Sequence, residues 1–228
     1  MTEQTPYQNV TFPSNGGTAH GYLAVPDSGS GPGLIVVQEW WGLTDHIADV
    51  TNRFAREGFV ALAPDLYGGR TTHDAEEASA LMNELPPEKA VTELSGAVDY
   101  LLSQQSVTGS AVGVVGFCMG GLFALNLAAQ AGGKVGAVVV FYGTFSGDED
   151  FSAVRAPVLG VVGGQDAFTP AERARAVLGR ISGPVDVQVY DAGHAFFNDE
   201  NLLGTYDDEK ARQAWAQAVD FLRQHLAG

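Results

Sequence analysis

Residues 112–121 read Val-Gly-Val-Val-Gly-Phe-Cys-Met-Gly-Gly, and residues 122–129 continue as Leu-Phe-Ala-Leu-Asn-Leu-Ala-Ala. An apolar run of strand type therefore passes through Gly-Phe-Cys-Met-Gly straight into an apolar helical segment. A sharp strand-to-helix turn of this kind holds a nucleophile in a strained backbone conformation. It needs small residues two positions before and two positions after that nucleophile. Gly116 and Gly120 meet this need, so the spacing predicts a nucleophile elbow with Cys118 at its tip.

Cys118 is the single cysteine of the 228-residue chain, which excludes an intramolecular disulfide and a cysteine-rich zinc site. At the start of a helix, the dipole and the free N–H groups favour its thiolate form. The alternative is a buried small hydrophobe, the commoner fate of a lone cysteine. A dinucleotide-binding loop is less favoured, because Gly113, Gly116 and Gly120 lack the G-x-G-x-x-G spacing. A redox role would lack a resolving cysteine in the chain.

On both sides of the elbow, short β-branched runs alternate with longer helical stretches. This pattern indicates a mostly parallel sheet with helices on both faces. We expect one α/β domain over residues 1–228. An N-terminal hairpin is expected from two strand-like runs around the turn at residues 14–17. The predicted strands are 7–12, 20–25, 34–37, 59–63, 112–115, 135–141, 158–162 and 185–190. The predicted helices are 44–57, 87–104, 119–130, 170–181 and 207–226, the fourth with a capping box from Thr169 to Glu172.

The base and the acid of a nucleophilic site are expected after later strands, in the order nucleophile, acid, histidine. Gly163-Gly164-Gln165-Asp166 follows one predicted strand, and Asp191-Ala192-Gly193-His194 follows the next. Both segments come at the carboxyl edge, where open α/β sheets build their sites. His194 alone among the five histidines has this context. We predict Asp166 as its partner and keep Asp191, only three residues before His194, as the alternative.

A carboxylate and two indoles follow the strand at residues 34–37, in the order Glu39, Trp40, Trp41. In folds with a nucleophile elbow, this loop supplies one N–H group to the oxyanion hole, and the residue after the nucleophile supplies the other. The sequence thus predicts the N–H groups of Trp40 and Met119 for that role. One indole is expected to pack in the core. Trp41 is a candidate, with Glu39, for binding the substrate or modulating the thiol. A carboxylate at the end of a buried strand is a candidate neighbour of the thiol.

The charge balance limits the class of partner. The chain has 27 acidic and 12 basic residues, a formal charge of -15, and no basic cluster that could displace counterions from nucleic acid. Its longest apolar stretches fall far short of the roughly 20 residues that a membrane span requires. The polar N-terminus lacks the pattern of a secretory signal. We therefore expect a cytoplasmic protein, favour a monomer, and expect neither nucleic acid nor membrane as a partner.

Taken together, these segments resemble the dienelactone hydrolase family of the α/β-hydrolase superfamily, which uses cysteine in place of serine. The resemblance spans nearly the whole chain in the expected order. It rests on Gln38-Glu39, Pro64-Asp65-Leu66-Tyr67, Gly116-Phe117-Cys118-Met119-Gly120-Gly121, Phe141-Tyr142-Gly143, Gly163-Gly164-Gln165-Asp166 and Gly193-His194-Ala195-Phe196.

The resemblance implies an α/β-hydrolase fold and a Cys118-His194-Asp166 triad, with Glu39 near the thiol to hold its proton or to influence thiolate formation. It also implies hydrolysis of a lactone or related activated ester, without metal or cofactor. Members that act on dienelactone grip the substrate carboxylate with two arginines. Asn198 stands at one of these positions and Arg70 is the arginine available for the other, so dienelactone itself is left open as the substrate.

Two further expectations concern the surroundings of the site. Residues 72–85 read as a helical segment rich in glutamate, which is more typical of an acidic surface helix than of a lid. The alternative function, from a different class, is a non-catalytic relative that keeps the fold and uses the pocket only to bind a small molecule.

Overall fold

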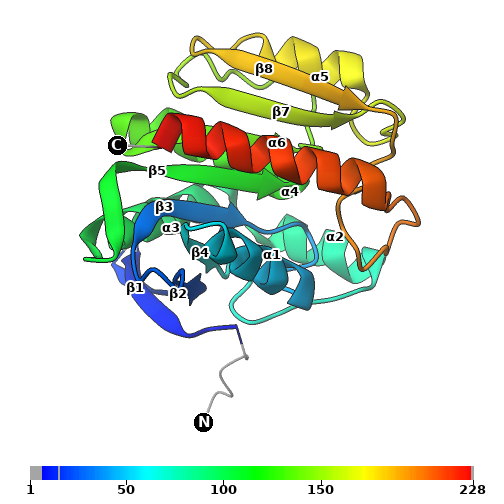
Figure 1. Ribbon diagram of the computed structural model, residues 1–228. Helices are drawn as coiled ribbons and strands as arrows, with labels where there is room; N and C mark the ends of the chain where they lie inside the picture. The colour runs from blue at the N-terminus through cyan, green and yellow to red at the C-terminus, as the bar shows by residue number, and fades with distance from the viewer. Residues whose placement is uncertain (1–6, 15, 227–228) are drawn as a thin grey trace.

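The computed structural model describes residues 7–14 and 16–226. Residue 15 of the predicted turn and the first six residues of the N-terminal segment lie outside the described residues. Within them the chain forms one eight-stranded sheet in the order β1-β2-β4-β3-β5-β6-β7-β8 (Figure 1). The strands are β1 Val10–Ser14, β2 Gly17–Ala24, β3 Gly31–Val37, β4 Val60–Pro64, β5 Val107–Phe117, β6 Val135–Phe141, β7 Val158–Gly163 and β8 Val185–Tyr190.

The sheet has an antiparallel part and a parallel part. The β1–β2 and β2–β4 pairs are antiparallel, which confirms the N-terminal hairpin, and the pairs from β4 through β8 are parallel. Strands β3, β4, β6 and β7 are apolar runs buried almost throughout, as expected for strands covered on both faces. Strand β5 is buried only in its second half, from Val112 to Phe117. Parallel pairing brings the carboxyl ends of β3, β5, β7 and β8 to one edge, where the predicted site residues follow.

Helices cover both faces of this sheet. They are α1 Asp45–Arg56, α2 Ala75–Glu84, α3 Pro87–Ser103, α4 Met119–Ala131, α5 Ala171–Leu178 and α6 Asp208–Leu226. In Figure 1, α1 and α6 lie in front of the sheet and α3 lies behind it. Trp215 of α6 packs on Phe54 of α1 with ring centroids 4.3 Å apart, and α4 packs beside α3. The predicted α/β architecture with helices on both faces is thus confirmed.

Two local predictions need correction. The capping box at Thr169 is wrong, since α5 begins at Ala171 without a side-chain cap, and the Thr169 hydroxyl instead accepts the buried N–H of Phe145 at 3.2 Å. Helix α5 also ends at Leu178, three residues earlier than predicted, with Gly179 as its C-cap. The first difference arises because a long-range contact competes with the local helix signal. The second follows from Gly179, a residue of low helix propensity.

Residues 72–85 do contain a helix, α2, which begins after Asp74. The Asp74 carboxylate accepts the N–H groups of Glu76 and Glu77 and so caps the helix. Ala78 and Leu81 on the inner face of α2 are buried. No helix in the described part of the chain is both long and apolar enough to cross a membrane.

Candidate active site

Cys118 lies at the turn between β5 and α4 with φ of 55° and ψ of -120°. A non-glycine residue with positive φ costs about 1–3 kcal/mol, and such strain persists only where the surroundings enforce it. Here the Cys118 N–H donates to the Phe141 carbonyl at 3.0 Å. A Cβ atom on Gly116 would overlap the Gly120 carbonyl, and one on Gly120 would lie 2.5 Å from the carbonyl oxygens of Val37 and Gln38. The backbone has the strained geometry that the spacing of the two glycines predicts.

His194 and Asp166 form a buried pair beside this turn. The Asp166 Oδ2 atom lies 2.7 Å from Nδ1 of His194, and both residues are at most 5% exposed. The other Asp166 oxygen accepts the N–H groups of Phe168 at 2.8 Å and Thr169 at 2.9 Å. Asp191 is exposed and accepts a hydrogen bond from Gln165 instead. The structure thus pairs His194 with Asp166 and not with the alternative carboxylate.

The remaining ring nitrogen of His194, Nε2, is buried and has no hydrogen-bond partner among the described residues. Burial lowers the pKa of His194, but the hydrogen bond to Asp166 and the neighbouring Cys118 sulfur outweigh it and raise the pKa to about 10. The charge attraction between the sulfur and the ring exists only while the sulfur is ionised. An imidazolium and a thiolate at these two positions therefore stabilise each other.

Cys118 and His194 line one cavity of about 400 Å³. A larger depression of about 600 Å³ beside residues 24–28 and 52–58 lies away from both. Most of the smaller cavity's wall is apolar, and Phe168 is 4.7 Å from the His194 ring between centroids. The other lining residues are Trp40, Met82, Leu122, Thr144, Phe145, Ser146, Glu149, Thr169 and Leu203. Helix α2, through Met82, is therefore a wall of the cavity as well as a surface helix.

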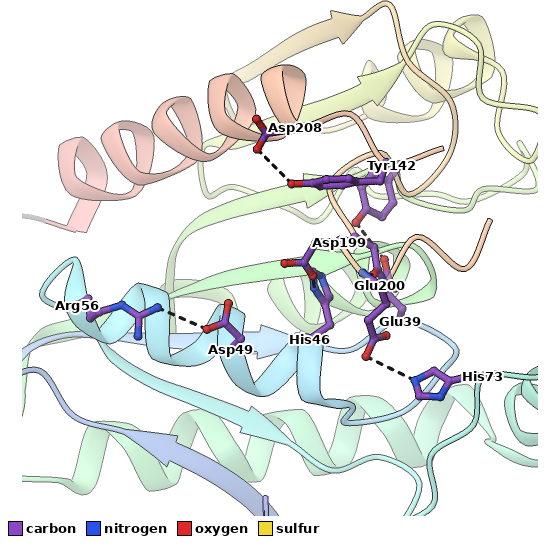
Figure 2. Close-up of polar contacts among 11 residues, drawn as sticks. Glu39, His46, Asp49, Arg56, His73, Tyr142, Asp199, Glu200 and Asp208 are labelled. Carbon is purple, nitrogen blue, oxygen red and sulfur yellow. Dashed lines mark hydrogen bonds and ion pairs between the residues drawn. The ribbon is translucent and has the colours of Figure 1, made fainter. Parts of the chain in front are cut away.

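Glu39 is 2% exposed and lies behind the cavity wall rather than on it. Its Oε1 accepts a hydrogen bond from the hydroxyl of Tyr142 at 3.0 Å (Figure 2). Its Oε2 accepts one from Nδ2 of Asn198 at 2.5 Å. Burial and the adjacent Glu39 carboxylate hold the pKa of Tyr142 well above its usual value, so this hydroxyl stays a donor. Both oxygens of Glu39 thus have partners other than the thiol in this arrangement.

The loop after His194 is held in place by two histidine–carboxylate contacts. Asp199 Oδ1 lies 2.7 Å from Nδ1 of His46 on α1, and Glu200 Oε1 lies 3.5 Å from Nε2 of His73. Figure 2 shows both contacts beside Glu39 and Tyr142. Hydrogen bonding to His46 lowers the pKa of Asp199. These contacts fix the segment that carries Asn198, the donor to Glu39.

The predicted substrate-binding residues Trp41, Arg70 and Asn198 are likewise absent from the cavity lining. Trp41 is buried against Trp40, at 4.9 Å between ring centroids, so one of the two indoles packs inward as expected. Arg70 pairs with Glu84 at 2.9 Å on the surface. Asn198 is buried and engaged with Glu39.

The two amides predicted for the oxyanion hole are near the cavity. Trp40 lines it, and Met119 is the first residue of α4 directly after Cys118. Among the described residues neither N–H has a backbone or side-chain acceptor. For Met119 this is usual, because it lies in the first turn of a helix. Within the same part of the chain, no group of three or more histidine, cysteine, aspartate or glutamate side chains is arranged to hold a metal ion.

Sequence reasoning did not place Phe168 or Glu149 in this region, and it quoted Tyr142 only within Phe141-Tyr142-Gly143, a segment that carries the resemblance, without giving it a role. Tyr142 follows the carboxyl end of β6 and has φ of 37°, so its place after a buried parallel strand was the available signal. Phe168 follows the acid by two residues. No local pattern marks Glu149, which reaches the cavity from the loop after β6.

Comparison with known proteins agrees with this geometry. The model of the dienelactone hydrolase family matches residues 19–226. The chain is 33% identical to "Protein usf" of Aquifex pyrophilus, with 96% of this chain and 99% of the relative covered. It is 32% identical to a protein of Aquifex aeolicus described as "Putative carboxymethylenebutenolidase", with 96% and 99% covered.

A solved structure extends the agreement to the fold. The crystal structure of a dienelactone hydrolase-like promiscuous phosphotriesterase from metagenomic libraries superposes with a TM-score of 0.81 at 27% identity. The match covers 95% of this chain and 96% of that one. With the elbow, the cavity and the family match over most of its length, the chain belongs to the dienelactone hydrolase family and is a hydrolase.

Proposed function

We propose that the protein hydrolyses lactones or activated esters through a Cys118-His194-Asp166 triad and a thioester intermediate. The observation that carries the proposal is the buried His194–Asp166 pair, which leaves Nε2 without a partner in the cavity that Cys118 also lines. This is the arrangement in which a histidine can exchange a proton with a thiol while a carboxylate fixes its tautomer.

In the first half-reaction the Cys118 thiolate attacks the acyl carbonyl, and the N–H groups of Trp40 and Met119 hold the resulting oxyanion. The tetrahedral intermediate collapses with cleavage of the C–O bond to the leaving group. The imidazolium of His194 transfers its proton to the departing oxygen. The acyl group is then bound to Sγ as a thioester, and His194 is neutral.

In the second half-reaction neutral His194 removes a proton from water, which attacks the thioester. The electrostatic logic is consistent with this change of role. A thioester carries no charge, so the contribution of Cys118 that raises the pKa of His194 in the free enzyme disappears. Burial then favours the neutral imidazole, the form that a general base requires. Collapse of the second intermediate releases the acid and regenerates the thiolate and the imidazolium.

A thiolate is a better leaving group than an alkoxide, which restricts the substrates. Collapse of the first intermediate favours expulsion of the thiolate unless the competing oxygen leaves easily. Enol esters, lactones and aryl esters therefore fit the proposal better than simple alkyl esters. Glu39 has Tyr142 and Asn198 as partners, and we assign it the support of the site from behind the cavity.

The test is hydrolysis of an enol lactone, a 4-nitrophenyl ester and an ethyl ester by the wild type and by Cys118→Ala. We expect turnover of the first two and a loss of about 1,000-fold or more in Cys118→Ala, as for other covalent nucleophiles. Because Cys118 is the only cysteine, rapid quenching and mass spectrometry should find one acyl adduct, on that residue. His225→Gln is the matched histidine control. Full activity of Cys118→Ala would show that the mechanism is wrong, and binding without turnover would favour the non-catalytic alternative.

A further inference from the structure

Charge is distributed unevenly around the cavity that contains Cys118. Its lining includes one carboxylate, Glu149, and neither a lysine nor an arginine among the described residues. Arg70 is paired with Glu84 outside it. Two guanidinium groups reach the Glu149 loop, but they donate to main-chain carbonyls and do not line the cavity: Arg173 to Phe145 and Arg180 to Glu149. His194 is thus the only side chain in the described cavity lining that could carry a positive charge and attract an anionic substrate.

Glu149 is fixed in place by its own loop. Its Oε1 accepts the N–H of Ser146 at 2.6 Å and the hydroxyl of Ser146 at 2.9 Å, and its Oε2 accepts the N–H of Gly147 at 2.9 Å. Partial burial raises the pKa of Glu149, but these hydrogen bonds outweigh it and lower the pKa. At neutral pH the residue is therefore a fixed negative charge at the cavity.

The remaining wall favours apolar groups. Trp40, Phe145 and Phe168 contribute aromatic surface, and Met82, Leu122 and Leu203 contribute aliphatic surface. The positive charge of His194 is matched by the thiolate in the proposed resting state, so it does not offset Glu149. A carboxylate on the substrate would then lose hydration against apolar wall and face a like charge.

We infer that the cavity selects uncharged esters or lactones with apolar substituents, and that Glu149 is a specificity-determining residue which disfavours substrates bearing a carboxylate. This inference rests on the hydrolytic function proposed above. It agrees with the position of Arg70 outside the cavity, because the cavity has no arginine or lysine to bind a substrate carboxylate and has the carboxylate of Glu149 instead.

Two esters that differ in one charge provide the test: mono-4-nitrophenyl glutarate, which is anionic, and its methyl ester, which is neutral. Nitrophenolate release reports the same bond in both. For the wild type at low salt we expect kcat/KM to be about 10- to 30-fold higher for the neutral ester, the size of the repulsion between two like charges roughly 8 to 12 Å apart at an effective dielectric constant near 20. Added salt should bring this ratio closer to 1, because it screens the repulsion between the two negative charges. This test needs no variant.

The variant Glu149→Gln should narrow the ratio several-fold, mainly by raising kcat/KM for the anionic ester. Asp148→Asn is the matched control, since Asp148 is an exposed carboxylate in the same loop that does not line the cavity, and it should leave the ratio unchanged. Equal kcat/KM values for the two esters, or a ratio that Glu149→Gln and salt leave unaltered, would overturn the inference alone. If neither ester were turned over faster than by Cys118→Ala, the hydrolytic proposal would fail and this inference with it.

Discussion

Gly120 shows how tightly the elbow around Cys118 is packed. A Cβ atom there would approach the carbonyl oxygens of Val37 and Gln38 to 2.5 Å, and both are backbone atoms that cannot swing aside. Gly120→Ala must therefore push α4 away from β3 and displace Cys118. We expect a loss of about 1–3 kcal/mol in the free energy of unfolding, typical of overpacking, and at least a 10-fold loss of kcat/KM on an aryl ester.

Gly133→Ala is the control for this substitution. A Cβ atom on Gly133 would meet nothing within 4 Å, and its φ is not positive. We expect the same change there to leave activity unaltered and stability unchanged or higher by up to about 1 kcal/mol. Urea unfolding and initial rates measure both quantities. Equal behaviour of the two variants would show that the elbow tolerates a side chain at Gly120.

The candidate site residues predicted from the sequence share a physical origin. Cys118, Asp166 and His194 each follow an apolar β-branched run, and such runs can be recognised because strands buried on both faces carry few polar residues. Parallel pairing then brings the ends of these strands to one edge of the sheet. Glu39 was predicted by the same reasoning, but its partners Tyr142 and Asn198 were not assigned to it, because hydrogen bonds across 103 and 159 residues leave no local pattern.

Helix α2 illustrates which contacts of a helix cannot be predicted from its sequence. Its glutamates indicated a surface helix, and the exposed side does carry Glu76 and Glu77. Only the tertiary fold determines that Met82 lines the cavity. The same holds for Thr169, whose hydroxyl bonds to Phe145 instead of capping α5. A side chain's local preference is weak beside the cost of an unpaired buried N–H.

The exposed ion pair between Arg70 and Glu84 links α2 to the loop after β4, and it leads to a prediction about Arg70. Both side chains are more than half exposed, at 56% and 59%, so the pair contributes little stability. Arg70→Ala should change the free energy of unfolding by less than about 1 kcal/mol. Its kcat/KM for the anionic and neutral glutarate esters should stay near that of the wild type.

Met82→Ala, from the inner side of the same helix, is the informative contrast. It enlarges the cavity next to Cys118 and should raise KM for the neutral ester, because apolar contact is lost. Steady-state kinetics on both variants separate the two sides of α2. If Arg70→Ala lost activity on the anionic ester alone, Arg70 would instead be a residue that binds the substrate carboxylate.

The raised pKa of His194 makes the stability of the whole protein depend on pH. Its pKa is about 10 in the folded state and 6.5 in the reference state, so folding favours the protonated form. The resulting stabilisation is fully present below pH 6.5 and is lost as pH rises toward 10. Between these values His194 alone binds more protons in the folded state, which lowers the free energy of unfolding by up to about 1.4 kcal/mol per pH unit. Where Cys118 is a thiolate in the folded state, the proton that it has lost cancels this difference up to the ordinary thiol pKa of about 8.5, so the loss of stability is expected mainly above that pH.

Urea unfolding at pH 6, 8 and 10 would measure this slope for the wild type and for His194→Gln. The carboxylates that dominate the charge of -15 are largely ionised throughout this range and therefore add little to the difference. We expect the wild type to lose more stability than His194→Gln between pH 6 and 10. Parallel pH profiles for the two proteins would mean that His194 releases its proton near its ordinary pKa. In that case the imidazolium would not be available at neutral pH to protonate the leaving group.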